Sequence, residues 1–477
     1  MKLKYIMSSL TEIENPMFDI LSVASLDTSV SNIIFRKYEP DVGLTDTSTS
    51  ININVRDLRE FISLSSSFIE LKGRYGQTSS TACGATHRPA LECGATSLFN
   101  QSRLRINQVL VEDNFSTSHL NAFVKQLTTQ SRDYQDTLGR NSGFILDRGD
   151  GGALAVATAY TSFNALAKTN NGYLERRLEA NPANIDQGVG GNSTLNPQKS
   201  YVIRLSDLFS FCTVNKVIRG STLRIELNLR SKEERMFSQV TGSYFFPTNI
   251  NLFLAVVEPS LEMQSKLESV LASPVTMPYQ YVNWKVYQSD TLAGSVLNRS
   301  FTYSIQSQKP LGAFIFSQRG PNAGTEDLYN SMIFDSARVN FVQMRINNKL
   351  FPYTPFEPDF SESSDGTTVV AGSSNIAREY EELCKFMSKN YNLDSGLSIS
   401  PKEWEQLYPL YYVPLYNLPD SSSYQITLDT KLKDAVGTAI TDGQRNRGTN
   451  VTFYLCLMTL AEVQVKSDGQ GVQIYNM

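Results

Sequence analysis

The sequence predicts an all-β chain made of two similar domains of the sandwich or jelly-roll class, with a few short helices in the connecting loops. Three observations predict it: short alternating strands dominate, helical patterns are few, and one ordered set of segments occurs twice. At 477 residues the chain is too long for one small core. We therefore expect at least two domains.

The strand signals are short runs in which β-branched or aromatic residues alternate with polar ones, bounded by Ser, Thr, Gly, Asn or Pro. In the first half they cover 50–55, 67–73, 103–111, 201–205, 222–229 and 251–257. In the second half they cover 281–287, 300–305, 312–317, 339–346, 411–415, 424–428, 451–458 and 461–465. Many short strands joined by turns are typical of sandwiches and jelly rolls.

Helical patterns are limited to a few segments. Residues 116–129 place Leu120, Phe123, Val124 and Leu127 at the spacing of one helical face. Further helices are predicted over 375–388, over 401–407 with Pro401 at the first helical position, and over 260–271. The last of these falls where the first domain would end.

An internal duplication supports the two-domain prediction. RINQVL begins at Arg105 and RINNKL at Arg345, 240 residues later, and each is followed by a loop and one of the two main helices. Two further strands and a closing strand follow in both halves, with Leu227 aligned to Leu428. The same order found twice predicts one fold repeated.

Composition argues against several classes of function. Charged residues make up 19%, the net charge is −4, and there are only two histidines. The chain is not basic enough to hold nucleic acid over its whole surface, and it offers little for histidine-based catalysis. We therefore predict no enzyme, no catalytic residues and no cofactor.

The cysteines and the N-terminus indicate where the chain works. Five widely spaced cysteines fit no disulfide framework, so a reducing compartment fits best. Cys83 and Cys93 flank His87, but no fourth zinc ligand is evident, so free thiols are expected and no metal. No signal-peptide core or membrane-length apolar run is present, so we expect a soluble chain.

Several segments in their order resemble a known family. They are SININV at 50–55, FISLSSSFIELKGRY at 61–75, SLFNQSRLRINQVLVED at 97–113, VIRLSDLFSFCTVNKVIRGSTLRIELNLRSKEE at 202–234, and MRINNKLFPYTPFEPDF at 344–360. Over roughly residues 50–465 the chain resembles the double jelly-roll major capsid proteins of Polinton elements, adintoviruses and virophages. Adenovirus hexon belongs to the same wider lineage of DNA viruses.

The resemblance implies a structural role without chemistry. Two tandem eight-stranded jelly rolls would stand side by side, and a homotrimer would form a pseudo-hexagonal, hexon-like capsomer. Such capsomers would tile an icosahedral capsid, so the expected location is the virion, assembled inside the host cell. Low charge and abundant Tyr and Phe suit large buried contacts between subunits.

The resemblance also implies domain limits and partners. We expect an N-terminal arm at 1–44, jelly roll 1 at 45–263, jelly roll 2 at 264–470 and a C-terminal tail at 471–477. Expected partners are neighbouring capsomers, penton and minor capsid proteins, and an internal membrane reached by the arm. Long loops at one end would form the outer face. No sequence-specific nucleic-acid binding is expected.

One short motif and two other functions stay open at this point. Arg148, Gly149 and Asp150 form an RGD triplet in a glycine-rich segment, a candidate receptor-contact loop. A receptor- or carbohydrate-binding spike would show an aromatic-lined groove. An enzyme on tandem sandwiches would show two facing carboxylates, such as Glu381 with Glu382 or Glu403 with Glu405.

Overall fold

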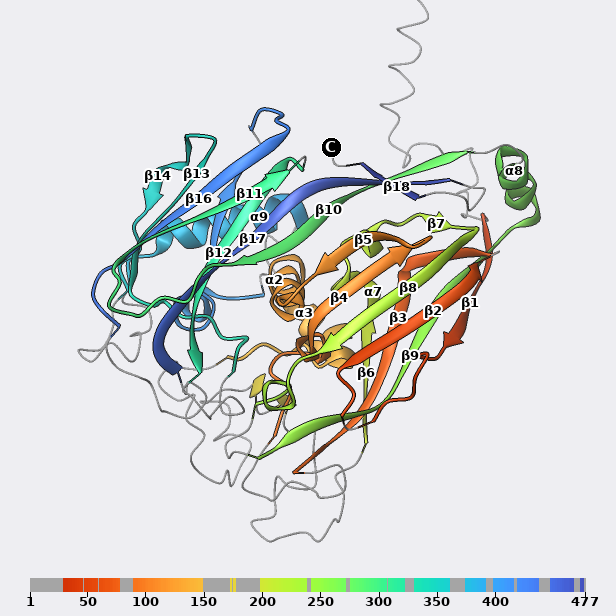
Figure 1. The fold of residues 1–477 in the computed structure, drawn as a ribbon, viewed down its shortest axis with the longest axis horizontal. Helices are drawn as coiled ribbons and strands as arrows, with labels where there is room; N and C mark the ends of the chain where they lie inside the picture. The colour runs from red at the N-terminus through yellow and green to blue at the C-terminus, as the bar shows by residue number, and fades with distance from the viewer. Residues whose placement is uncertain are drawn as a thin grey trace, which may run out of the picture.

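Four antiparallel sheets form the molecule in a computed structural model (Figure 1). It describes residues 29–45, 47–58, 60–77, 89–148, 172–173, 175–176, 198–237, 242–271, 275–306, 308–321, 330–360, 374–391, 398–415, 418–436, 447–466 and 472–475.

The first two sheets come from the first half of the chain. One has the strand order β1-β9-β3-β6, with the short β7 also paired to β3, and the other has the order β2-β8-β4-β5. The strands are β1 (Val30–Tyr38), β2 (Ser50–Leu58), β3 (Phe61–Gly76), β4 (Phe99–Ile106), β5 (Val109–Asn114), β6 (Lys199–Arg204), β7 (Val217–Ile218), β8 (Ser221–Leu229) and β9 (Tyr244–Pro259).

The second half repeats the eight main strands of this arrangement in the same order. Its sheets have the orders β10-β17-β12-β15, with β18 added beside β17, and β11-β16-β13-β14. The strands are β10 (Thr276–Gln288), β11 (Asn298–Gln306), β12 (Pro310–Pro321), β13 (Val339–Ile346), β14 (Lys349–Phe356), β15 (Tyr411–Pro414), β16 (Ser423–Leu432), β17 (Arg447–Lys466) and β18 (Val472–Tyr475). Each half is thus an eight-stranded jelly roll, which confirms the predicted fold class.

Strict alternation explains why these segments form sheets with one buried face. In β8, Leu223, Ile225 and Leu227 are at most 1% exposed, while the residues between them face outward. Successive side chains of a strand point to opposite faces, so this pattern turns one face toward the core. The predicted strand at 222–229 matches β8.

The prediction of one strand over 103–111 is wrong. Asn107 and Gln108 adopt φ angles of 48° and 68°, which turn the chain back between β4 and β5. Two successive residues with positive φ form the two-residue hairpin turn whose twist matches the strands, and Asn tolerates that conformation. Asn347 and Asn348 make the same turn between β13 and β14, with φ angles of 45° and 69°.

Two further differences concern strands at opposite ends of the chain. The separate strands predicted at 451–458 and 461–465 are one continuous strand, β17. Strand β1 lies within the segment predicted to be an arm, and it pairs with β9 in the first sheet. The proposed limits of arm, jelly rolls and tail stay a prediction.

The main helices occupy corresponding positions in the two halves. Helix α2 (Ser118–Thr129) follows β5, and α9 (Ala377–Tyr391) follows β14 in the second half. The short α10 (Pro401–Gln406) precedes β15, and α8 (Leu261–Leu271) connects the two jelly rolls between β9 and β10. All four segments were expected to be helical.

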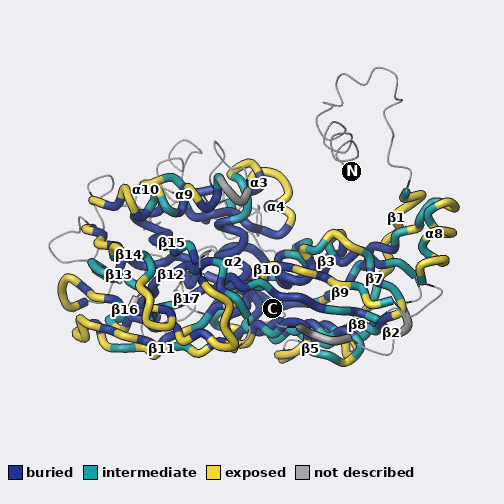
Figure 2. Tube along the Cα trace, turned by 90° about the horizontal axis from the view of Figure 1, so that it is seen from above, coloured by how far each residue is buried: buried dark blue, intermediate teal, exposed yellow. Residues whose placement is uncertain are grey.

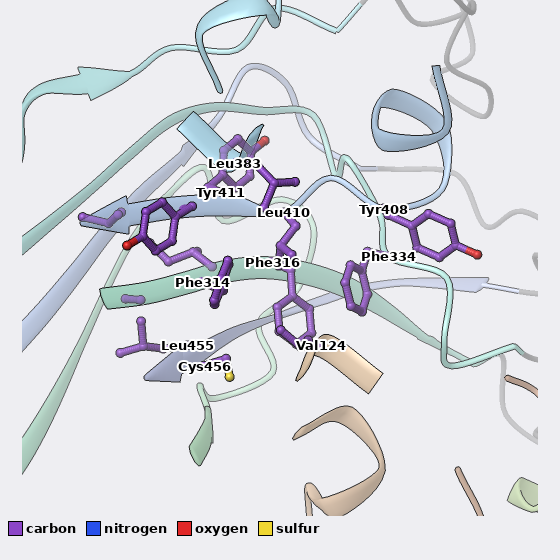
Figure 3. Packing of buried hydrophobic residues seen from close by; sticks show 14 of the residues in the cluster. Val124, Phe314, Phe316, Phe334, Leu383, Tyr408, Leu410, Tyr411, Leu455 and Cys456 are labelled. Carbon is purple, nitrogen blue, oxygen red and sulfur yellow. The ribbon is translucent and has the colours of Figure 1, made fainter. Parts of the chain in front are cut away.

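The hydrophobic cores of the jelly rolls cross the boundary between them. Helix α2 belongs to the first half, yet Phe123 packs against Phe334 of the second half, with ring centroids 5.6 Å apart. Val124 lies in the same cluster, among Phe316, Phe334 and other residues of the second jelly roll (Figure 3).

Strands β10 and β17 of the second half reach into the first core in return. The ring of Tyr281 lies 5.5 Å from that of Phe211, and Val463 and Val465 are fully buried in the same cluster. The two jelly rolls lie side by side, with α2 and β10 between them (Figure 2). The two jelly rolls therefore pack against each other as a single unit and are not independent domains joined by a linker.

Candidate functional site

A row of phenylalanine rings crosses the outer face of the sheet β1-β9-β3-β6. Phe35 of β1 lies 5.4 Å from Phe68 of β3, and Phe68 stacks on Phe253 of β9 at 5.1 Å. Ile69, next to Phe68, is fully buried on the opposite face, so the row faces outward. Phe35 is 48% exposed, which leaves an aromatic surface open for contact.

The free edge of this sheet is also apolar. Strand β1 pairs with β9 and with no other strand of the described chain, and Val30, Ile33 and Ile34 are 42–47% exposed. An exposed apolar edge strand invites pairing with another chain. This edge and the phenylalanine row form one continuous surface, which we call the β1 surface.

Helix α8 extends the β1 surface. The backbone N–H of Ser260, just before the helix, donates to the carbonyl of Ser29, just before β1, at 2.9 Å. No residue of α8 is buried, and Leu261 is 85% exposed. Both views place α8 beside β1 at one extremity of the molecule (Figures 1 and 2). A helix that exposes apolar residues such as Leu261 and Val270 beside an open strand edge is typical of a contact surface.

A pocket of about 310 Å³ lies further along the same sheet face. Ser65, Tyr134, Arg204 and Asp207 are among its lining residues. The guanidinium of Arg204 lies 5.7 Å from the centre of the Tyr134 ring. Burial raises the pKa of the Asp207 carboxyl, although the positive charges of Lys125 and Arg204 oppose this shift. The pocket therefore has charged residues at its base and lies next to the phenylalanine row.

A buried polar cluster joins the two jelly rolls. Arg230 and Glu92, from the first half, form an ion pair at 2.6 Å with side chains only 6% and 1% exposed. Ser331, from the second half, donates to the same carboxylate through its hydroxyl at 2.6 Å and its backbone N–H at 3.1 Å. A buried carboxylate that is fully hydrogen-bonded holds its partners in one arrangement. We call this cluster the Glu92 junction.

A second buried carboxylate makes a matching connection. Asp147 pairs with Arg176 at 2.8 Å and accepts a hydrogen bond from the Asn330 amide of the second half at 2.8 Å. The Tyr408 hydroxyl, also from the second half, donates to the Asp147 carbonyl at 3.1 Å. The carboxylates of Glu92 and Asp147, both in the first jelly roll, thus hold the loop at 330–331 of the second jelly roll in place.

Arg148, the first residue of the candidate receptor triplet, lies next to this cluster. Arg148 is only partly exposed, and it donates to the side-chain oxygen of Gln135 at 2.6 Å, while its Nε lies 3.9 Å from Glu403. Gly149 and Asp150 lie outside the described residues. A receptor contact by the triplet stays a prediction.

The carboxylates considered for an enzyme have structural contacts. Glu403 and Ser400 form a reciprocal capping box at the start of α10. Glu405 accepts a hydrogen bond from the backbone N–H of Ser374 at 3.1 Å. Glu382 forms an ion pair with Lys385 on α9. These contacts explain the pairs as parts of helix ends and helix surfaces.

His119 and Cys93 lie in environments that suppress their chemistry. Burial, aided by the charge of Arg230, holds the pKa of His119 well below its usual range. Burial raises the pKa of the Cys93 thiol to about 12. Cys83 and His87 of the considered zinc group lie outside the described residues. Across the described ranges, no three His, Cys, Asp or Glu side chains gather as metal ligands would.

Within the part of the chain that the structure describes, no helix is both long enough and apolar enough to cross a membrane.

Comparison with known proteins relates this fold to viral capsids. No family profile and no curated protein sequence matches the chain. Among solved structures, the mavirus major capsid protein has a TM-score of 0.51 and 11% identity, covering 98% of this chain and 95% of that chain. A chain of the Sputnik virophage has a TM-score of 0.52 and 10% identity, covering 97% and 92%. A chain of the PBCV-1 virus capsid has a TM-score of 0.52 and 8% identity, covering 95% of this chain and 98% of that chain.

Since these identities are near 10%, the comparisons establish the fold. The chain has the double jelly-roll fold of viral major capsid proteins, and the predicted resemblance to that group is confirmed at this level. The β1 surface and the Glu92 junction were not foreseen from the sequence.

Proposed function

We propose that the chain is the structural major capsid protein of an icosahedral DNA virus and resides in the virion. Three copies would form a homotrimer, and its six jelly rolls would give a pseudo-hexagonal capsomer. Such capsomers would tile the shell. The protein would act through its surfaces and catalyse no reaction.

One observation carries this proposal: two jelly rolls of identical strand order share interpenetrating cores. Helix α2 enters the second core, and β17 enters the first, so the pair cannot hinge freely. A rigid pair with two similar halves is the unit from which a three-fold ring acquires near six-fold symmetry. Closed rings of identical subunits need this kind of fixed geometry.

The β1 surface would supply one contact between subunits or capsomers. Its exposed Ile33, Ile34 and Phe35 offer apolar area, and its unpaired edge offers backbone hydrogen bonds. Obligate contacts of this kind commonly bury more than roughly 2,000 Å². An open edge would thus be covered in the assembled shell.

Further partners follow from the same proposal. Neighbouring capsomers, penton and minor capsid proteins would contact the sides and base of the trimer. The predicted arm at 1–44 would reach such neighbours or an internal membrane, and the RGD triplet at 148–150 would lie on a receptor-contact loop. The two jelly rolls would span residues 45–263 and 264–470, and the C-terminal tail would span 471–477.

Size-exclusion chromatography with light scattering tests the trimer. The purified chain should elute near three times its 53.3 kDa mass, and negative-stain images should show hexagonal plates or shells. Ile33→Asp places a charge on the β1 surface and should shift the protein toward monomer. Tyr353→Asp is the control, because Tyr353 lies on β14, away from this surface, and is 87% exposed. A wild-type chain that stays monomeric at high concentration would refute the proposal.

A further inference from the structure

A second pocket, of about 640 Å³, opens at one end of the first jelly roll and is lined by three arginines. Arg56, Arg105 and Arg224 line it together with Asn107 and Thr222, and no acidic residue is among its lining residues. Guanidinium groups are the side chains best suited to bind planar or tetrahedral oxyanions. The pocket therefore has the charge and the donors of an anion site.

Two of these arginines are placed in an arrangement that sheets ordinarily avoid. Arg105 of β4 and Arg224 of β8 are direct cross-strand partners. Like charges directly opposite each other destabilise a sheet. Glu226 relieves part of this repulsion, since it lies 3.5 Å from Arg105 and 2.8 Å from Arg224.

That single carboxylate does not neutralise the group. Glu226 is shared with a third arginine, Arg103, at 3.7 Å, while Arg103 also pairs with Asp113 at 3.0 Å. Among the described residues, Arg56 is exposed and has no ion-pair partner within 4 Å. An excess of positive charge thus remains at the pocket mouth.

The second jelly roll provides an internal comparison at the same position. Arg345 corresponds to Arg105, and it lies 3.3 Å from Asp429, which corresponds to Glu226. Its cross-strand partner is Thr427, in the place that Arg224 holds in the first repeat. The fold therefore does not need a second arginine there, and the extra charge of the first jelly roll requires another explanation.

The position of the pocket suggests what would meet it. It lies beside the two-residue turn at 107–108 and the turn at Gly220, whereas the long connections 77–98, 115–198 and 230–243 all leave from the opposite end of the jelly roll. Since the long loops would form the outer face of the capsid, the end of the jelly roll that carries the pocket would face the interior. We propose that the pocket binds phosphate groups of the packaged nucleic acid beneath the capsomer. This inference rests on the capsid function proposed above.

Nucleic acid fits the pocket better than a lipid surface does. Val55 and Leu223, which contribute apolar atoms to the pocket wall, are only 1% exposed and belong to the core beneath. The pocket thus offers arginines and amides without an apolar group that would enter a membrane. Contacts to phosphates carry no base sequence, so the predicted absence of sequence-specific binding is retained.

Binding of a short fluorescein-labelled DNA duplex by the full-length chain, followed by anisotropy over a range of salt concentrations, tests the inference. Arg224→Thr introduces the residue of the second repeat and should weaken binding roughly tenfold at low salt. It should also lower the slope of log affinity against log salt by about 1, and addition of Arg56→Gln by about 1 more. Arg345→Ala is the matched control and should leave binding nearly unchanged.

Folding and lipid binding are measured on the same proteins. Arg224→Thr removes a like-charge pair, so its melting temperature should equal or exceed that of the wild type. Equal salt slopes for wild type and Arg224→Thr would overturn the inference. Binding to phosphatidylserine vesicles without binding to DNA would overturn it as well. A trimer that does not bind DNA would refute the pocket alone. A monomer whose DNA binding needs Arg224 would instead refute the capsid function.

Discussion

The side-chain oxygen of Asn107 accepts a hydrogen bond from the backbone N–H of Thr222 at 2.7 Å, and the second half of the chain repeats this contact. There the side-chain oxygen of Asn347 accepts from the backbone N–H of Gln425 at 2.9 Å. In both halves the asparagine backbone N–H also donates to the carbonyl of the same partner, at 3.0 Å. The duplication is thus preserved in individual hydrogen bonds, although the two halves differ in most residues.

Replacement of Asn107 should destabilise the fold through the turn. Asn107→Ala should lower the free energy of unfolding by about 2 kcal/mol, since alanine resists positive φ and leaves the Thr222 N–H without its acceptor. Asn107→Gly should cost only about 1 kcal/mol, because glycine retains the backbone freedom. Urea denaturation measures both, and an equal loss for Ala and Gly would contradict the role of positive φ.

Loss of the Glu92 carboxylate should be among the most damaging single changes. Glu92→Gln leaves Arg230 buried without its counter-charge, for an expected loss of about 3–5 kcal/mol in denaturant titration. The double variant Glu92→Gln with Arg230→Met should recover much of this loss. The control is Glu262→Gln on α8, where the ion pair with Lys266 is exposed, and no measurable change is expected. A Glu92→Gln protein as stable as wild type would contradict the junction.

Truncation of a first-half residue should destabilise the second jelly roll. Leu127 of α2 is fully buried in the core cluster of the second half, so Leu127→Ala should cost about 3 kcal/mol. Both tryptophans, Trp284 and Trp404, lie in that cluster, so tryptophan fluorescence reports on it.

The fluorescence and far-ultraviolet circular dichroism transitions of Leu127→Ala should shift together, because the cores interpenetrate. Leu138→Ala is the control, since Leu138 is 51% exposed. Two separate transitions, with only the first shifted, would contradict the shared core.

Acid should weaken the protein through His119. In the unfolded chain an imidazole binds a proton near pH 6.5, whereas the folded pKa is depressed, so the unfolded state binds more protons and stability falls as the pH falls below about 6.5. Between pH 7.5 and pH 5.5 this amounts to about 1.4 kcal/mol. Over the same pH interval the His119→Gln protein should lose about 1.4 kcal/mol less stability than the wild type. An identical pH dependence in both proteins would contradict the burial of a neutral His119.

The sequence predicted the strands well wherever one face is buried, because alternation with a period of two is a local property. The residue-by-residue alignment of the two repeats was harder to predict. Aligning Leu227 with Leu428 is off by two residues, since the cross-strand pairs Leu104–Ile225 and Met344–Leu428 make Ile225 the equivalent of Leu428. A shift of two keeps the same side-chain face, so the hydrophobic pattern could not reveal the error.

Strand β1 escaped prediction for the opposite reason. Ile33, Ile34 and Phe35 are consecutive apolar residues, and all three are more than 40% exposed, so no alternation marks a buried face. The hairpin at Asn107 was missed since it lacks the glycine that usually identifies such turns. The sequence showed that α2 is amphipathic, but a local pattern cannot say which of two cores an apolar face will cover.

The candidate sites depended even more on distant contacts. Glu92 and Ser331 are 239 residues apart, and only the fold brings them together. The sequence directed attention to the RGD triplet, whose preceding residue Asp147 is fully buried. The arginine pocket instead comes from strands and turns, where charge on an exposed face is unremarkable until its neighbours are known.

The path of β17 through both cores has a consequence for synthesis of the protein. Phe453 and Leu455 of this strand complete the second core, while Val463 and Val465 complete the first, and β17 comes after all of β1 to β16 in the chain. Neither core can close while the ribosome is still translating the earlier strands. The first jelly roll must therefore wait, with apolar surface open, for residues made some 200 positions after its own last strand. Folding should be largely post-translational, and production of the protein should respond strongly to chaperone supply.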